Sequence, residues 1–234
     1  MMITTLRHPP PTPSPEAVAE PVIVVSQNYL APYVIDLNVT RKMMMMLMEG
    51  TTISVNDIYG DQWFKVRGKM LSLRDRRVLF DVADNPLVTF QHKLLTAHRR
   101  WIAYRGDSTD ENDVLFTVRQ SSLIQVTSDS KTKLEVFMAH NMAKEGNGVC
   151  DFYVKGSCCE TSCDIFIGGT KTMIAQMHRS QSFFSAYLGK DNFTMSIRPN
   201  VDYAFIVSLV VILEEINSER KRQELVIKSC GLFG

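Results

Sequence analysis

Most of the cysteines, together with one histidine, lie close enough along the chain to raise the question of a metal site. Cys158, Cys159 and Cys163 are near neighbours, Cys150 precedes them and His178 follows. Structural zinc sites are normally built from pairs of ligands with the spacing C-x2–4-C. Here the spacing is CC-x3-C without a second pair. We therefore expect ordinary thiols on strands and no bound metal ion.

Catalytic groups are equally hard to assemble from the sequence. Nucleophilic catalysis needs a serine or cysteine held against a histidine and a carboxylate, but the chain has no G-x-S-x-G segment and no papain-like cysteine. His92, His98, His140 and His178 lie in strand-like segments, where we expect surface or core roles. The segment GKDNF (189–193) lacks the G-x4-GK[ST] spacing of a phosphate-binding loop. The sequence predicts neither an enzyme nor a cofactor.

Positive charge is concentrated in the first half of the chain. The formal net charge of the whole chain is +1, yet residues 41–105 contain twelve Lys and Arg against six Asp and Glu. Cations near a membrane surface contribute ~1 kcal/mol each, so three to six of them would support reversible docking to anionic lipid at ~3–6 kcal/mol. The candidate lipid-binding residues are Lys65, Arg67, Lys69, Arg74, Arg76 and Arg77. The alternative is an ordinary solvated strand face that carboxylates elsewhere neutralise.

The elements that would position these cations are mostly strands. Residues 1–21 hold six of the nine prolines, and we expect a disordered tail there. From residue 21 to residue 212, short apolar runs separated by turn signals predict about twelve strands, which is typical of a sandwich or barrel. We predict turns at Tyr59-Gly60-Asp61, Asp84-Asn85-Pro86 and Gly168-Gly169.

A weak internal repeat suggests two related halves, each a run of antiparallel strands. WFKVRG (63–68) matches DFYVKG (151–156) in residue type. About 25 residues further on, VTFQHK (88–93) follows the first segment and the similar IAQMHR (174–179) follows the second.

One strong helix is predicted near the C-terminus, in NVDYAFIVSLVVILEEINSERKR (200–222). Between Tyr203 and Leu213 only Ser208 is polar, and this run is shorter than the ~20 residues that cross a bilayer. We predict Asn200 as the N-cap, with Asp202 in the first turn. A helix that is apolar on all sides must be enclosed, and a barrel of twelve strands is too wide to fill itself. We therefore expect the helix inside the barrel, with a core of Tyr203, Phe205, Ile206, Leu209, Val210 and Leu213.

Several segments resemble the plant LURP-one-related proteins, over about residues 21–220. They include APYVIDLNVTRK (31–42), RRVLFDVADNPLVTF (76–90), RRWIAYRGDST (99–109), LFTVRQSSLIQVTS (115–128) and PNVDYAFIVSLVVILEEIN (199–217). The resemblance implies a tubby-like fold, which is a closed barrel of about twelve antiparallel strands around one central C-terminal helix. It places one domain at residues 22–220 and a C-terminal extension at 221–234, and it relates the chain to tubby proteins and phospholipid scramblases.

The same resemblance implies a function. The protein would be a non-enzymatic, membrane-tethered or phosphoinositide-binding regulator in plant defence signalling, with anionic phospholipid headgroups as partners. The alternative is a protein-interaction scaffold without lipid binding, for which PPPTPSP (9–15) is a candidate partner ligand. We find no zinc finger, no basic helix and no aromatic stacking pattern for nucleic acid. An odd number of cysteines without an apolar signal segment predicts an intracellular protein, which is cytoplasmic, peripheral at the plasma membrane, or nuclear.

Overall fold

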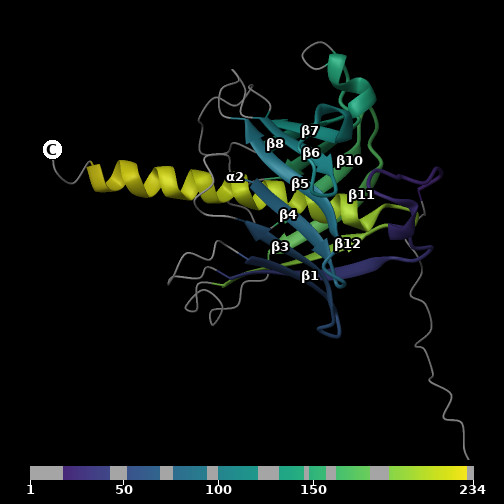
Figure 1. The fold of residues 1–234 in the computed structure, drawn as a ribbon, viewed down its shortest axis with the longest axis horizontal. Helices are drawn as coiled ribbons and strands as arrows, with labels where there is room; N and C mark the ends of the chain where they lie inside the picture. The colour runs from purple at the N-terminus through teal and green to yellow at the C-terminus, as the bar shows by residue number, and fades with distance from the viewer. Residues whose placement is uncertain are drawn as a thin grey trace, which may run out of the picture.

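Twelve antiparallel strands form a closed barrel around one helix (Figure 1). The computed structural model describes residues 18–42, 52–68, 76–93, 100–120, 132–144, 148–156, 162–179 and 190–230. The strands are β1 (Ile35–Lys42), β2 (Thr52–Asp57), β3 (Gln62–Gly68), β4 (Arg76–Asp81), β5 (Pro86–Lys93), β6 (Arg100–Arg105), β7 (Val114–Gln120), β8 (Thr132–Met138), β9 (Phe152–Gly156), β10 (Ser162–Ile167), β11 (Met173–Arg179) and β12 (Lys190–Ile197). The helix α2 (Tyr203–Cys230) follows, and the described residues also contain the short 3-10 helices η1 (Gln27–Tyr29), η2 (Glu111–Asp113) and η3 (Ala139–Lys144). The predicted fold class is confirmed.

Each strand pairs with its neighbours in sequence, and β1 closes the barrel on β12 in a register that runs from Ile35↔Ile197 to Lys42↔Lys190. Alternation decides which side chains point inward, because successive residues of a strand face opposite sides. On β3, for example, Phe64 and Val66 are buried while Lys65 and Arg67 face outward. The hairpin turns form where they are predicted, and Gly60, Asp84 and Gly169 adopt the left-handed conformation with φ of 95°, 65° and 67°.

The two ends of the barrel differ. At the turn end, short connections join β2 to β3, β4 to β5 and β10 to β11, and α2 begins there after β12. At the exit end, α2 leaves the barrel and projects beyond the strands (Figure 1). The segments of the internal repeat fall on β3 and β9 and on β5 and β11, so each pair lies halfway round the twelve-strand order.

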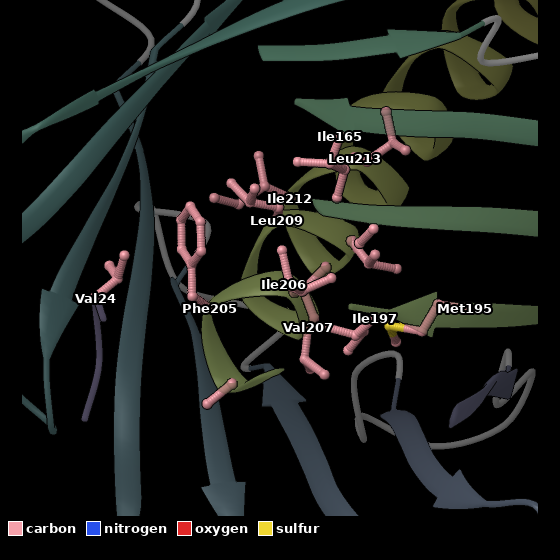
Figure 2. Close-up of a cluster of buried hydrophobic side chains, with 14 of the residues drawn as sticks. Val24, Ile165, Met195, Ile197, Phe205, Ile206, Val207, Leu209, Ile212 and Leu213 are labelled. Carbon is pink, nitrogen blue, oxygen red and sulfur yellow. The ribbon is translucent and has the colours of Figure 1, made fainter. Parts of the chain in front are cut away.

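The first part of α2 is enclosed on all sides. Phe205 and Ile206 are 0% exposed, Leu209 is 1%, Val210 is 2% and Leu213 is 5%. Figure 2 shows Phe205, Ile206, Leu209 and Leu213 of the helix packed among residues of the surrounding strands such as Ile165, Met195 and Ile197. Tyr203 is half-buried, and its ring packs against Tyr29, Trp63 and Phe64 with ring centroids 5.4–5.9 Å apart. Burial of this many apolar side chains, at ~1.5–3 kcal/mol each, is the main force that holds the helix in the barrel.

The start of α2 differs from the prediction. Asn200 is not the N-cap; it has a φ of 64°, and its backbone N–H donates to the carbonyl of Ala31. Asp202 caps the helix instead, because its Oδ1 accepts a hydrogen bond from the N–H of Phe205 at 3.1 Å. Its Oδ2 accepts from the N–H groups of residues 24, 25 and 26 at 2.7–3.1 Å. One buried carboxylate therefore ties the N-terminal segment to the helix.

The described chain reaches beyond the predicted domain limits of 22 and 220. Val18 is 6% exposed and belongs to the core. At the other end, α2 continues to Cys230. The disordered tail and the domain boundaries themselves stay predictions.

Candidate anion-binding site

The candidate lipid-binding cations of β3 share one carboxylate. The Nζ of Lys65 lies 2.6 Å from Oδ1 of Asp84, and a guanidinium nitrogen of Arg67 lies 3.1 Å from the same oxygen. The guanidinium of Arg67 also lies 5.2 Å from the centroid of the Phe80 ring. The hydrogen bond from Lys65, helped by the charge of Arg67, lowers the pKa of Asp84. This pair of cations is therefore partly neutralised where it stands.

The two arginines at the start of β4 point to opposite sides of the barrel wall. Arg76 lies on the outer face and binds the carboxylate of Asp107, and it also donates to the carbonyl of Asp107 at 2.9 Å. Arg77 is 6% exposed and points inward, where it binds Oε2 of Glu215 on α2 at 3.1 Å. Lys69 and Arg74 lie outside the described residues. Of the six candidates, the structure brings Lys65 and Arg67 together and turns Arg77 away from the surface.

Arg77 belongs to a polar layer inside the barrel, just beyond the apolar part of α2. Glu214 and Glu215 are each 3% exposed. Arg41 of β1 donates to the carbonyl of Glu214 at 3.4 Å and binds the hydroxyl of Ser218. Removing one partner of a buried ion pair costs ~3–5 kcal/mol, because the other charge stays buried and uncompensated. This layer fixes the position of α2 where it leaves the barrel.

A histidine completes the layer. Nδ1 of His92 on β5 lies 3.2 Å from Oε1 of Glu219 on α2. The ring of His92 stacks on Trp101, with centroids 4.9 Å apart and an interplanar angle of 8°. His92 and Trp101 are directly paired across β5 and β6, so their neighbours Lys93 and Arg100 must point to the outer face.

On that outer face, three cations stand side by side on neighbouring strands. Lys93 of β5 pairs directly with Arg100 of β6, and Arg100 pairs directly with Arg119 of β7. Directly paired residues have Cβ atoms ~4.5–5.5 Å apart, and like charges in such positions are destabilising. Arg119 has a counter-ion, because Glu135 of β8 accepts its Nε–H at 2.9 Å. We call Lys93, Arg100 and Arg119 the cation row.

The cation row is not among the residues singled out from the sequence. Lys93 and Arg100 contribute to the first-half excess of positive charge, and Arg119 lies beyond that span. What makes them a group is the strand register across β5, β6 and β7. Alternation within each strand gives the outward direction of each side chain, but only the pairing places them next to one another.

A groove of about 510 Å³ opens at the turn end, between residues 18–24 and the ends of β8 to β11. Its lining includes His140 and Asp151, whose Nε2 and Oδ1 atoms are 3.8 Å apart. Such a pair could activate a nucleophile, but no serine or cysteine is among the described residues that line the groove. Asp151 has a structural partner, because its Oδ2 accepts from the backbone N–H of Met138 at 2.8 Å.

The cysteines do not assemble a reactive site in the part of the chain that the structure describes. Burial, with smaller effects of Asp164 and Glu214, raises the pKa of Cys163 to about 12. Cys158 and Cys159 lie outside the described residues. Among the residues with described positions, no group of three or more His, Cys, Asp and Glu could hold a metal ion.

None of the described helices has both the length and the apolar character needed to cross a bilayer.

Comparison with known proteins gives consistent matches over most of the chain. A model of the family described as LURP-one-related matches residues 35–214. The Arabidopsis thaliana protein LURP-one-related 15 is 45% identical over 211 residues, which cover 90% of this chain and 92% of that protein. Arabidopsis thaliana LURP1 is 39% identical over 197 residues, 84% of this chain and 91% of the relative. A solved X-ray structure of an Arabidopsis thaliana protein matches with a TM-score of 0.62 and 39% identity, and covers 83% of this chain and 98% of its own.

Proposed function

The chain belongs to the LURP-one-related family, and from this premise we propose that it is a non-enzymatic binding module that docks on anionic phospholipid headgroups through the cation row. The observation that carries the proposal is the direct pairing of Lys93, Arg100 and Arg119 on three neighbouring strands. The sequence resemblance adds that such docking would serve a regulator in plant defence signalling, in a fold related to those of tubby proteins and phospholipid scramblases.

The geometry suits phosphate ligands. A phosphate oxygen can lie between two cations whose Cβ atoms are ~5 Å apart, and the fork of N–H groups on arginine favours bidentate contact with phosphate. Arg119 is ion-paired with Glu135 and only partly exposed, so at ~1 kcal/mol for each cation near an anionic surface Lys93 and Arg100 would contribute ~2 kcal/mol, or about thirtyfold in affinity. That is enough for reversible docking.

The distribution of charge along the barrel would orient the molecule. Lys93 ends β5, Arg100 begins β6 and Arg119 lies near the end of β7, so the row is at the exit end. Carboxylates gather at the turn end of β2 to β7, in the strand ends and connections: Asp57, Asp61, Asp81, Asp84, Asp107, Asp110, Glu111 and Asp113. An anionic membrane would attract the exit end and repel the turn end.

The proposal is tested by co-sedimentation of the protein with vesicles of phosphatidylcholine alone, or with added phosphatidylserine or phosphatidylinositol 4,5-bisphosphate. We expect binding only to the anionic vesicles, and we expect the bound fraction to fall as the salt concentration rises. The double variant K93Q/R100Q should bind about 30-fold more weakly, because two contributions of ~1 kcal/mol are lost.

A matched control removes the same charge elsewhere on the outer face. The double variant K65Q/R67Q should change binding by less than about threefold, because these cations lie on β3, outside the cation row, and contact Asp84 of the β4–β5 turn. Equal binding to phosphatidylcholine vesicles, or equal losses in the two double variants, would refute the assignment to the cation row. Competition by free inositol hexakisphosphate would show whether the phosphate chemistry alone suffices or the bilayer is needed.

A further inference from the structure

Two neighbouring hairpins at the turn end hold large apolar side chains out in solvent. Ile58 and Tyr59, at the β2–β3 turn, are 62% and 84% exposed, and Val82, at the β4–β5 turn, is 67% exposed. Tight turns normally carry Gly, Asn, Asp, Ser or Pro. Tyr33, two residues before β1, is 61% exposed. We call these four residues the hairpin-tip surface.

The two tips are built in the same way. In the first, Oδ1 of Asp57 accepts the N–H groups of Tyr59 and Asp61, both at 2.9 Å. In the second, Oδ1 of Asp81 accepts the N–H groups of Ala83 and Asn85 at 2.9 and 2.8 Å. In each tip the aspartate is followed directly by the exposed aliphatic residue, Ile58 or Val82. Two positions after that residue the backbone has a positive φ, which is 95° at Gly60 and 65° at Asp84. The apolar tips are thus fixed in place, which reduces the entropy that a partner would have to remove.

The segments that carry these residues are neighbours at the turn end. β3 and β4 pair through Phe64↔Asp81, so the two hairpins are adjacent around the barrel. β1 pairs with β2 through Leu37↔Asp57, which places the start of β1 beside the first tip. Among the described residues, every large apolar side chain with high exposure lies at this end or on the segment that crosses it: Ile23, Tyr33, Ile58, Tyr59, Val82 and Val149. Contiguous exposed apolar residues with a polar rim mark interaction sites.

The rim is acidic. Desolvation raises the pKa of Asp81, but the hydrogen bonds from Asn85 and Ala83 outweigh it and lower the pKa overall. The hydrogen bond from Lys65 lowers the pKa of Asp84. Both carboxylates are therefore ionised at neutral pH. Asp84 is bound by Lys65 and Arg67, so the excess of negative charge comes from Asp57 and Asp61 of the first tip and Asp81 of the second. Negative charge around an apolar surface disfavours an anionic bilayer and favours a cationic polypeptide.

We propose that the hairpin-tip surface binds a cationic segment of a partner protein, whose apolar side chains pack on Ile58, Tyr59 and Val82 while its Lys and Arg side chains meet the carboxylates of the rim. This site is separate from the cation row, which lies at the opposite end of the barrel. The protein would then have two binding surfaces of opposite charge.

The test measures binding of two labelled synthetic peptides by fluorescence anisotropy, one of alternating Lys and Leu and one of alternating Glu and Leu. We expect saturable binding of the Lys/Leu peptide only. The double variant I58S/V82S should bind it at least about tenfold more weakly. Both replaced side chains are mostly exposed, so the melting temperature of the variant should match that of the parent chain.

Control variants separate this proposal from the others. V149S changes an equally exposed apolar residue outside the hairpin-tip surface and should leave peptide binding unchanged. K93Q/R100Q should also leave it unchanged, so a failure of lipid docking would not affect this result.

Three results would overturn the proposal: equal affinity for the Glu/Leu peptide, equal loss of affinity in V149S, or unchanged affinity in I58S/V82S. A loss of vesicle binding in I58S/V82S would assign the tips to the membrane instead. An increase in mass with concentration by light scattering, abolished by the same variant, would assign them to a second copy of this chain.

Discussion

Replacement of Asp202 by alanine should be among the most destabilising single changes in this protein. Asp202 is 0% exposed, and its carboxylate accepts four backbone N–H groups. One of these, from Phe205, is the N-cap bond of α2, whose loss costs ~1 kcal/mol. The others, from residues 24, 25 and 26, hold the N-terminal segment across the turn end of the barrel.

The size of the effect follows from these contacts. Val24 and Val25 are 7% and 6% exposed, so their N–H groups would stay buried without an acceptor, at ~1–3 kcal/mol each. Ser26 is only part-buried, and water can replace its bond. Together with the lost cap, the expected loss of folding free energy is ~3–7 kcal/mol. This loss is partly offset because the variant no longer buries a carboxylate, a burial that raises the pKa of Asp202 despite its N–H partners. This is a large share of a typical stability of ~5–15 kcal/mol.

Urea unfolding followed by tryptophan fluorescence measures this loss, because Trp63 packs on Tyr203 beside the cap. Asp202→Asn should lose about half as much as Asp202→Ala, since one side-chain oxygen remains to accept hydrogen bonds. Asp36→Ala is the matched control, because it removes an exposed carboxylate that accepts a hydrogen bond from the hydroxyl of Ser196 on the sheet surface, and should cost less than ~1 kcal/mol. A loss below ~1 kcal/mol for Asp202→Ala would refute the reasoning.

Two further changes probe the core. Val210 is 2% exposed, so Val210→Asp should abolish cooperative folding because it buries an unpaired charge. Val210→Ala should leave a soluble chain whose folded state is ~2 kcal/mol less stable. A cooperative thermal transition for the aspartate variant would contradict an enclosed helix. Because burial raises the pKa of Cys163 to about 12, the thiolate form is present in roughly one molecule in ten thousand near pH ~8. Alkylation by iodoacetamide, followed by mass spectrometry, should therefore be about a thousandfold faster in urea than in the native protein, and equal rates would contradict the burial of this thiol.

The fold could be predicted from the sequence because the patterns that indicate its strands, turns and helix are local. Alternating apolar residues and turn residues such as Gly60 and Asp84 report strands and hairpins over a few positions. The apolar run from Tyr203 to Leu213 requires an enclosure, and only the closed sheet can supply it. Strand number and helix position then agree with the resemblance to the LURP-one-related proteins.

The N-cap of α2 could not be predicted from the sequence, because the backbone groups that bind it are distant along the chain. Asn200 and Asp202 are equally good N-caps by residue type, and the N–H groups that hold the carboxylate of Asp202 lie 176–178 positions earlier in the chain. Arg77 shows the same limit. An arginine in an RDRR segment is normally a surface residue, and only Glu215 on α2 explains why it turns inward. The cation row depends on register, which single-strand patterns do not specify.

The two proposed surfaces can act independently because of their separation. β5 spans eight residues, which at ~3.3 Å per residue and with the tilt of barrel strands puts its ends roughly 20 Å apart. This exceeds the Debye length of ~8–10 Å at physiological ionic strength, so charge at one end is largely screened from the other. An anionic membrane that holds the exit end would leave the acidic hairpin-tip surface facing away from the lipid. A cationic partner bound there would not compete with the membrane for the same charges, and a rigid barrel filled by α2 would hold the two at a fixed distance.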